Sequence, residues 1–151
     1  MIAVPYYNQD TSYNCGPAAL QMVFAHYGFH FSEGELARRL KTKKETGTRN
    51  YRLAKMARRE GFITKTKSGA SLNQIKQYLD RDIPVIVNFI EPSHNDYHFA
   101  VVVGLTNGDV VLNDPWNGEK FTLPKKEFIK SWRSGERNHT HWLLALWPKE
   151  D

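Results

Sequence analysis

Cys15 is the only cysteine in the chain, and its neighbours indicate a nucleophile at the start of a helix. Gly16 and Pro17 follow it directly, and proline suits the first turn of a helix because its missing N–H is not needed there. The apolar run after them predicts a helix over 18–27 that ends at Gly28. Since the positive end of a helix dipole stabilises a thiolate, this position suits covalent catalysis by sulfur.

A thiolate nucleophile needs a base, a group that orients the base, and a donor for the oxyanion. His98 opens the apolar run 98–104 and can take the thiol proton. Asp114 lies between Asn113 and Pro115 and can fix the orientation of the imidazole. Gln9, shortly before the cysteine, carries an amide that can donate to a carbonyl oxygen. The chain therefore holds one candidate for each role.

Each of these residues also has an ordinary structural interpretation. A lone cysteine is often an inert core residue, and a histidine before an apolar strand is often a satisfied edge residue. An Asp-Pro pair favours turns, so the only role of Asp114 can be to open a turn. Gln9 can be an ordinary surface amide. The combination of all four residues favours the catalytic interpretation.

Three segments resemble the bacteriocin-processing, double-glycine leader peptidase family of papain-like cysteine peptidases. They are Asn14-Cys15-Gly16-Pro17-Ala18-Ala19-Leu20, His98-Phe99-Ala100-Val101-Val102-Val103-Gly104 and Asn113-Asp114-Pro115. They occur in the family's order, and the resemblance runs from 4 to 132. It implies that Cys15 is the nucleophile, His98 the base, Asp114 the third triad member and Gln9 the oxyanion donor.

The resemblance also implies the reaction, which is hydrolysis of a peptide or related amide bond through an acyl-enzyme. An acyltransferase or transpeptidase on the same triad shares the first half of that reaction, and a non-catalytic peptide-binding module is a third alternative. In the family, the usual setting is the N-terminal domain of an exporting ATPase. This chain has no GxxxxGK[ST] loop and no transporter domain, which indicates a stand-alone member acting on a peptide or protein substrate. The other histidines show no ligand pattern, so we expect neither a metal nor a cofactor.

The composition is that of a soluble globular protein. With 151 residues, 40% hydrophobic and 25% charged, we expect one domain over 1–151. One cysteine allows no internal disulfide, and no apolar stretch reaches the roughly 18 residues of a membrane span. Met1 leads directly into Val4-Pro5 without a signal peptide, so we expect a cytoplasmic protein without a transmembrane segment.

The net charge of +5 is distributed unevenly. Between Arg38 and Lys67 lie 12 of the 21 basic residues, against the two acidic residues Glu45 and Glu60. This region is either a solvated helical face or a docking surface for an acidic partner or an anionic surface. Nucleic acid is not expected, because no aromatic platform accompanies the charge.

The periodicity places most helices before most strands. It predicts further helices over 33–40, 50–60, 71–80 and 126–132, and strands over 62–67, 83–90, 98–105, 109–113, 120–123 and 142–147. This order indicates an α+β fold. It agrees with the papain-like fold implied by the resemblance, with a mainly helical lobe (about 1–80) carrying the nucleophile helix and a mainly antiparallel sheet lobe (about 81–151).

The turn between the predicted strands 98–105 and 109–113 decides whether a triad can form. A two-residue Asn107-Gly108 turn pairs 106 with 109, and strict alternation then puts His98 and Asp114 on opposite faces of the sheet. A three-residue loop with Gly108 in the left-handed region, or a bulge elsewhere in the pair, puts them on one face. We therefore predict one of these two devices. The shared face also carries the small residues Ala100 and Gly104, and we expect the Cys15 helix to pack there.

Overall fold

The computed structural model describes residues 1–149, and the predicted helices and strands are present. The helices are α1 (Cys15–His26), α2 (Glu33–Arg39), α3 (Asn50–Arg59), α4 (Leu72–Leu79) and α5 (Lys125–Ser131). The strands are β1 (Phe62–Lys67), β2 (Val85–Glu91), β3 (Asp96–Leu105), β4 (Asp109–Asp114), β5 (Gly118–Pro124) and β6 (Leu143–Pro148). They form one antiparallel sheet in the order β1-β6-β2-β3-β4-β5. The fold is therefore α+β, as the sequence predicts.

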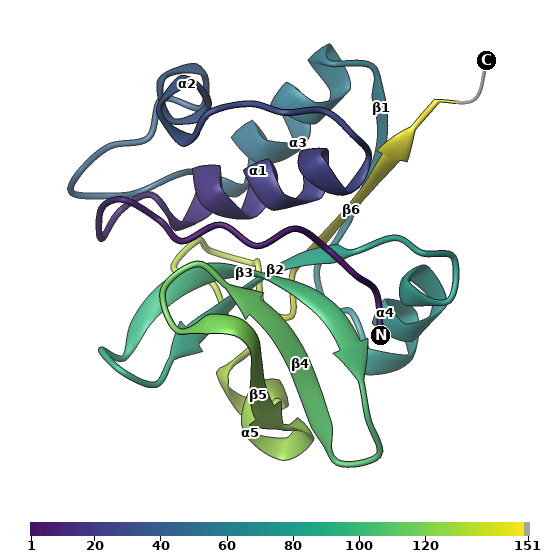
Figure 1. Ribbon diagram of the computed structural model, residues 1–151. Coiled ribbons are helices and arrows are strands. Elements are labelled where there is room, and N and C mark those ends of the chain that lie inside the picture. Colours follow the sequence, from purple (N-terminus) through teal and green to yellow (C-terminus); the bar gives the residue numbers. More distant parts are fainter. Residues whose placement is uncertain (150–151) are drawn as a thin grey trace.

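Helices cover both faces of this sheet, and a separate apolar core fills each interface. Figure 1 shows α1, α2 and α3 on one side, and α5 on the other. The core under α1 joins helix residues such as Met22 and Phe24 to Phe99 and Val101 of β3. The second core joins Phe128 and its neighbours to the opposite face of β2, β3 and β4. Because β1 comes from the first half of the chain and pairs with β6, residue 80 does not separate helices from strands.

The prediction that the Cys15 helix packs on the face of Ala100 and Val102 is wrong. Those two residues belong to the core under α5, and α1 packs on the face that carries Phe99, Val101 and Val103. The side chains on that face of the sheet are large, whereas α1 begins with small residues. The small residues of the helix, and not small residues of the strand, therefore allow the two elements to pack closely.

The ends of α1 follow from its glycine and proline residues. The helix begins at Cys15, three residues before the predicted start, so Pro17 lies in its first turn. A Cβ atom on Gly16 would lie 2.8 Å from Thr48 Oγ1, which requires glycine there. Gly28 adopts a φ of 86° just after the helix, where the left-handed region favours glycine.

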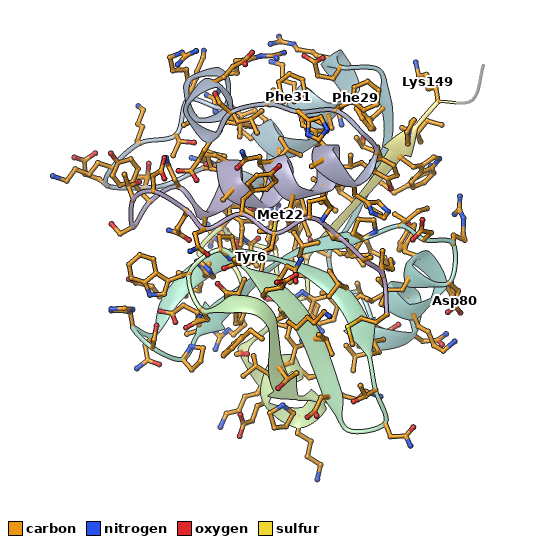
Figure 2. The ribbon with its side chains drawn as sticks, viewed as in Figure 1. Tyr6, Met22, Phe29, Phe31, Asp80 and Lys149 are labelled. Atoms are coloured by element: carbon orange, nitrogen blue, oxygen red, sulfur yellow. The ribbon has the colours of Figure 1, made fainter. Side chains whose placement is uncertain are left out.

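The N-terminal segment crosses between the helices and the sheet (Figure 1). Ile2 N–H donates to the Val103 carbonyl at 2.8 Å, and Gln9 N–H donates to the Pro115 carbonyl at 3.0 Å. Figure 2 shows Tyr6 beside the sheet, where its hydroxyl donates to the Asp114 backbone carbonyl at 2.6 Å. These bonds bring the residues around Gln9 to the ends of β3 and β4. None of the helices among residues 1–149 is long and apolar enough to cross a membrane.

Candidate active site

The Cys15 side chain lies where the start of α1 meets the start of β3. It is 9% exposed, and its sulfur accepts a hydrogen bond from the Phe99 backbone N–H at 3.5 Å. The sulfur also lies close enough to the His98 ring to contribute to the raised pKa of that histidine. As the first residue of α1, Cys15 carries one of the N–H groups that a helix leaves without an intrahelical partner. The sulfur therefore lies at the positive end of the α1 dipole and accepts an N–H from the strand.

His98 and Asp114 form a buried pair next to this sulfur. His98 is 6% exposed and Asp114 is 0% exposed, and the His98 Nε2 lies 2.5 Å from the Asp114 Oδ1. Because Nε2 faces the carboxylate, Nδ1 is left for the sulfur. The Phe89 ring meets the imidazole edge to face at 5.9 Å, which limits the orientations open to the ring.

The pair keeps opposite charges in a buried place. Burial lowers the pKa of His98, but its hydrogen bond to Asp114 and its interaction with the nearby Cys15 sulfur outweigh that effect and raise the pKa to about 10. Burial raises the pKa of Asp114, but the His98 bond, the imidazolium charge and the Asn117 donors lower it further than burial raises it. Near neutral pH the ring is therefore an imidazolium held by a carboxylate.

A β-bulge places the two residues on one face of the sheet. The turn itself has the two-residue register, because Leu105 pairs with Val110 and the Thr106 N–H donates to the Asp109 carbonyl. Gly108 does not adopt a positive φ, so the three-residue loop predicted with that glycine is wrong. The register shifts by one residue between Val102 and Gly104, and Val102 pairs with Leu112. The second device that the sequence analysis offered, a bulge elsewhere in the pair, is confirmed.

Asp114 opens a turn, as its structural interpretation predicts, and its carboxylate also contacts His98. Its Oδ1 accepts the backbone N–H groups of Trp116 at 2.9 Å and Asn117 at 3.0 Å, as expected of a residue that opens a turn. The same oxygen faces His98, so the turn holds the carboxylate in the orientation that the imidazole needs.

Two residues near this pair were not singled out by the sequence analysis. Asn117 Nδ2 lies 3.1 Å from Asp114 Oδ2 and 3.3 Å from Glu91 Oε2, so it links two buried carboxylates. Glu91 in turn accepts the backbone N–H groups of Ser93 and His94, which closes the β2–β3 hairpin beside the site. The only signal for Asn117 in the sequence was its place three residues after Asp114, within reach of an Asx turn.

Gln9 lies at the same cleft as Cys15, with its side-chain amide held by one contact. Its Nε2 donates to the Thr11 carbonyl at 2.6 Å. If the amide were flipped, the Gln9 Oε1 and the Thr11 carbonyl oxygen would be two acceptors at this short distance. The amide nitrogen therefore faces the Thr11 carbonyl. The second N–H of the amide remains available, because one nitrogen carries two hydrogens. Among residues 1–149, Gln9 Oε1 is buried without a hydrogen-bond partner.

Glu33, at the start of α2, holds the loop that joins Gln9 to Cys15. Its Oε2 accepts the Asp10 backbone N–H at 2.8 Å and the Asn14 Nδ2 at 3.0 Å. Glu33 is 7% exposed, which is unusual for a carboxylate at a helix start. The sequence analysis used this residue only to place the beginning of a helix, because nothing in the local pattern indicates burial.

An open cleft of about 420 Å³ leads to these residues. Cys15, His98 and Gln9 line it, together with Lys44–Gly47 on one side and a group from the hairpin 91–97 and Trp116 on the other. Trp116 is 46% exposed and therefore forms part of the rim rather than the core. His94, from a loop that the sequence analysis set aside, packs edge to face on Trp116 at 5.6 Å and lines the same cleft.

The remaining histidines lie elsewhere. His139 hydrogen-bonds to Asn50, His141 stacks on Trp132, and His26 contacts the Asp82 carbonyl. Within residues 1–149, no three His, Cys, Asp or Glu side chains gather as metal ligands would.

Known proteins resemble the chain over almost its whole length. The model of the Peptidase_C39 like family matches residues 1–138. The transport/processing ATP-binding protein ComA of Streptococcus pneumoniae R6 is 30% identical over 129 residues, which are 84% of this chain and 17% of ComA. The chain thus spans about one sixth of the length of that relative. An uncharacterised protein of Methanothermobacter marburgensis is 30% identical over 113 residues, covering 73% of this chain and 70% of that protein.

Solved structures agree with these matches. The crystal structure of the peptidase domain of Streptococcus ComA has a TM-score of 0.79 and 27% identity, covering 99% of this chain and 100% of that domain. A double glycine motif protease from an AMS/PCAT transporter, solved in complex with its leader peptide, has a TM-score of 0.78 and 24% identity, covering 97% and 93%. The second match concerns the fold alone. The fold, the family match and the shared length agree, and the chain belongs to the Peptidase_C39 like family.

Proposed function

We propose that this protein is an active cysteine peptidase in which Cys15 is the nucleophile, His98 the acid and base, and Asp114 the residue that orients His98. One observation carries the proposal: the His98 ring, which is hydrogen-bonded to the buried Asp114 carboxylate, lies beside the Cys15 sulfur at the cleft. A histidine that serves only the structure has no reason to join a buried carboxylate to a thiol.

The first half of the reaction forms an acyl-enzyme. The raised pKa of His98 keeps the ring protonated near neutral pH, so a proton is available beside the nucleophile. The thiolate attacks the carbonyl carbon of the cleaved bond, and the carbonyl oxygen becomes an oxyanion. Gln9 Nε2 and the Cys15 backbone N–H donate to that oxyanion. The His98 imidazolium then protonates the leaving amine as the C–N bond breaks.

The second half restores the enzyme. The neutral His98 takes a proton from water, and the hydroxide attacks the thioester carbon. The second oxyanion uses the same two donors, and its collapse releases the carboxylic acid product and the thiolate. Asp114 remains ionised throughout, because its role is to hold the ring and stabilise its charge.

For the substrate, we propose a peptide cleaved after a pair of glycines. A double glycine motif protease with the same fold was solved with a leader peptide, and the relative ComA is named as a processing protein. The cleft here is open to solvent beside Cys15, as a site for an extended peptide must be. Export is not part of the proposal, since the chain corresponds to 17% of ComA.

The test is a panel of peptides that differ at the two residues before the cleaved bond, assayed with wild type and Cys15→Ala. We expect cleavage by wild type, strongest after Gly-Gly, and none by the variant. The variant should stay folded, because loss of one small side chain costs about 1–2 kcal/mol. Loss of its fold at room temperature would remove the basis for calling Cys15 catalytic.

A thiol-reactive peptide-like probe gives an independent measurement. Wild type should be labelled rapidly at Cys15 near neutral pH, because an activated thiolate reacts faster than a thiol. Slow labelling of the native protein, with no peptide cleaved, would instead support a binding module that retained the cleft.

A further inference from the structure

A hollow of about 300 Å³ lies between α2 and α3, away from the residues of the proposed reaction. Six of the seven residues that line it are cationic. They are Arg38, Arg39, Lys41, Arg52, Lys55 and Arg59, with Met56 as the seventh. We call this the basic hollow. It gathers half of the 12 basic residues between Arg38 and Lys67 around one concavity.

Most of these charges have no compensating partner. Arg39 contacts Glu60 at 2.5 Å and Glu35 at 4.0 Å. The other five cations make no ion pair within 4 Å among residues 1–149. Cations at the C-terminal ends of α2 and α3 complement the helix dipoles. Lys55, however, lies in the middle of α3, and Arg52 lies in its first turn, where the dipole disfavours a cation. A concave group of like charges focuses a positive potential and favours an anionic occupant.

The basic hollow and the cleft share one loop. Lys41 lines the hollow, and Lys44 lines the cleft beside Cys15. Three peptide units span at most about 10 Å, so the two sites lie close along the surface. At about 3.3 Å per extended residue, a backbone separation of up to about 10 Å corresponds to about three residues. The long lysine side chains at both ends and the widths of the two sites lengthen the path to roughly 5 to 10 residues.

We propose that the basic hollow binds an acidic segment of the peptide substrate, roughly 5 to 10 residues from the cleaved bond. The inference rests on the proposed peptidase function and names a feature of its substrate. An acidic peptide is favoured because the same chain can occupy the cleft. No aromatic side chain lines the hollow itself, and the Arg52 guanidinium lies over one face of the adjacent Tyr51 ring at 5.1 Å, so the hollow offers little surface for stacking of nucleotide bases. A concave site also follows a peptide better than it follows the flat surface of a bilayer.

The kinetic test uses pairs of cleavable peptides with four Glu or four Gln residues, placed at several spacings on either side of the cleaved bond. We expect the acidic tail to lower KM about tenfold at low salt at one spacing, with kcat nearly unchanged. The advantage should shrink as NaCl rises from 50 to 500 mM, because these charges are exposed.

Two double variants locate the effect. Arg52→Glu with Lys55→Glu should abolish the advantage of the acidic tail and leave cleavage of the Gln peptide unchanged. Lys65→Glu with Lys130→Glu changes the net charge equally at exposed positions outside the hollow and should retain the advantage. Equal loss in both variants would overturn the proposal, since it would reflect net charge alone.

A binding measurement separates failure of this inference from failure of the peptidase proposal. The Cys15→Ala protein is titrated with fluorescent Glu-tailed and Gln-tailed peptides, with an oligonucleotide and with vesicles containing phosphatidylserine. Tighter binding of the Glu peptide, lost in the Arg52→Glu, Lys55→Glu background, supports the inference even if no peptide is cleaved. Equal binding of both peptides, or stronger binding of the oligonucleotide or the vesicles, overturns it while leaving peptide cleavage by the wild type unaffected.

Discussion

The Glu33→Ala substitution tests how the loop between Gln9 and Cys15 is held. One oxygen of this buried carboxylate accepts both the Asp10 N–H and the Asn14 Nδ2. Both donors lie within this loop, next to the two residues proposed to hold the oxyanion. Removing the carboxylate leaves both donors without their partner.

The contacts give the size of the expected effect. A hydrogen bond to a charged group contributes about 1.5–3 kcal/mol, so the two bonds together contribute about 3–6 kcal/mol. Water that enters the space, and relief from burying a carboxylate, offset part of this loss. We expect Glu33→Ala to lower the free energy of unfolding by about 2–3 kcal/mol. At about 2–4 °C per kcal/mol for a chain of this size, Tm should fall by about 4–12 °C.

The assay is urea and thermal unfolding of wild type, Glu33→Ala and the matched control Glu35→Ala. Glu35 lies in the same helix, and its side chain forms a 4.0 Å surface ion pair with Arg39, which contributes about 0–1 kcal/mol. Turnover should fall in Glu33→Ala, because the oxyanion donor loses its support, and stay near wild type in Glu35→Ala. If both variants unfold within about 0.5 kcal/mol of each other, the Glu33 bonds do not hold the loop and the reasoning is refuted.

Three further predictions concern other parts of the molecule. Gln9→Ala should slow turnover about a hundredfold, the scale of one lost oxyanion donor, with thiol alkylation unchanged; an equal fall in alkylation would show that Gln9 instead organises the loop. The pKa of His98, about 10, lies above its ordinary value, and the pKa of Asp114 lies below its ordinary value. The stabilisation of the folded state by this ion pair should therefore be complete between about pH 4 and 6.5. It should decline as the pH rises toward about 10 or falls below about 4. The free energy of unfolding measured against Asp114→Asn should follow that profile, and a difference independent of pH would contradict the ion pair. Gly16→Ala should lower the free energy of unfolding, measured with denaturant, by about 1–3 kcal/mol, because the added Cβ meets the Thr48 side chain at 2.8 Å. The control Gly34→Ala, whose nearest atom lies 4.0 Å away, should be neutral or stabilising. Equal effects of the two variants would show that α1 can shift to accommodate the methyl group.

Much of this protein follows from the sequence because its signals are local. The period of apolar residues predicted the helices and strands, since each period reflects the geometry of a single element. Cys15 stood out because glycine and proline after a cysteine suit only a helix start, which is a property of three adjacent residues. His98 and Asp114 stood out as residue types at the ends of predicted strands, and the structure brings them together.

The tertiary structure decided what depends on residues distant in sequence. Local turn preference gave the correct two-residue register at Asn107-Gly108, but the bulge near Val103 that brings His98 and Asp114 to one face has no turn signal of its own. The face on which α1 packs depends on how large side chains of β3 fit the small residues of the helix, and alternation along one strand cannot distinguish the two faces. Glu33 and Asn117 acquire their roles only when loops from different parts of the chain enclose them, because burial of a polar side chain is a property of the assembled fold.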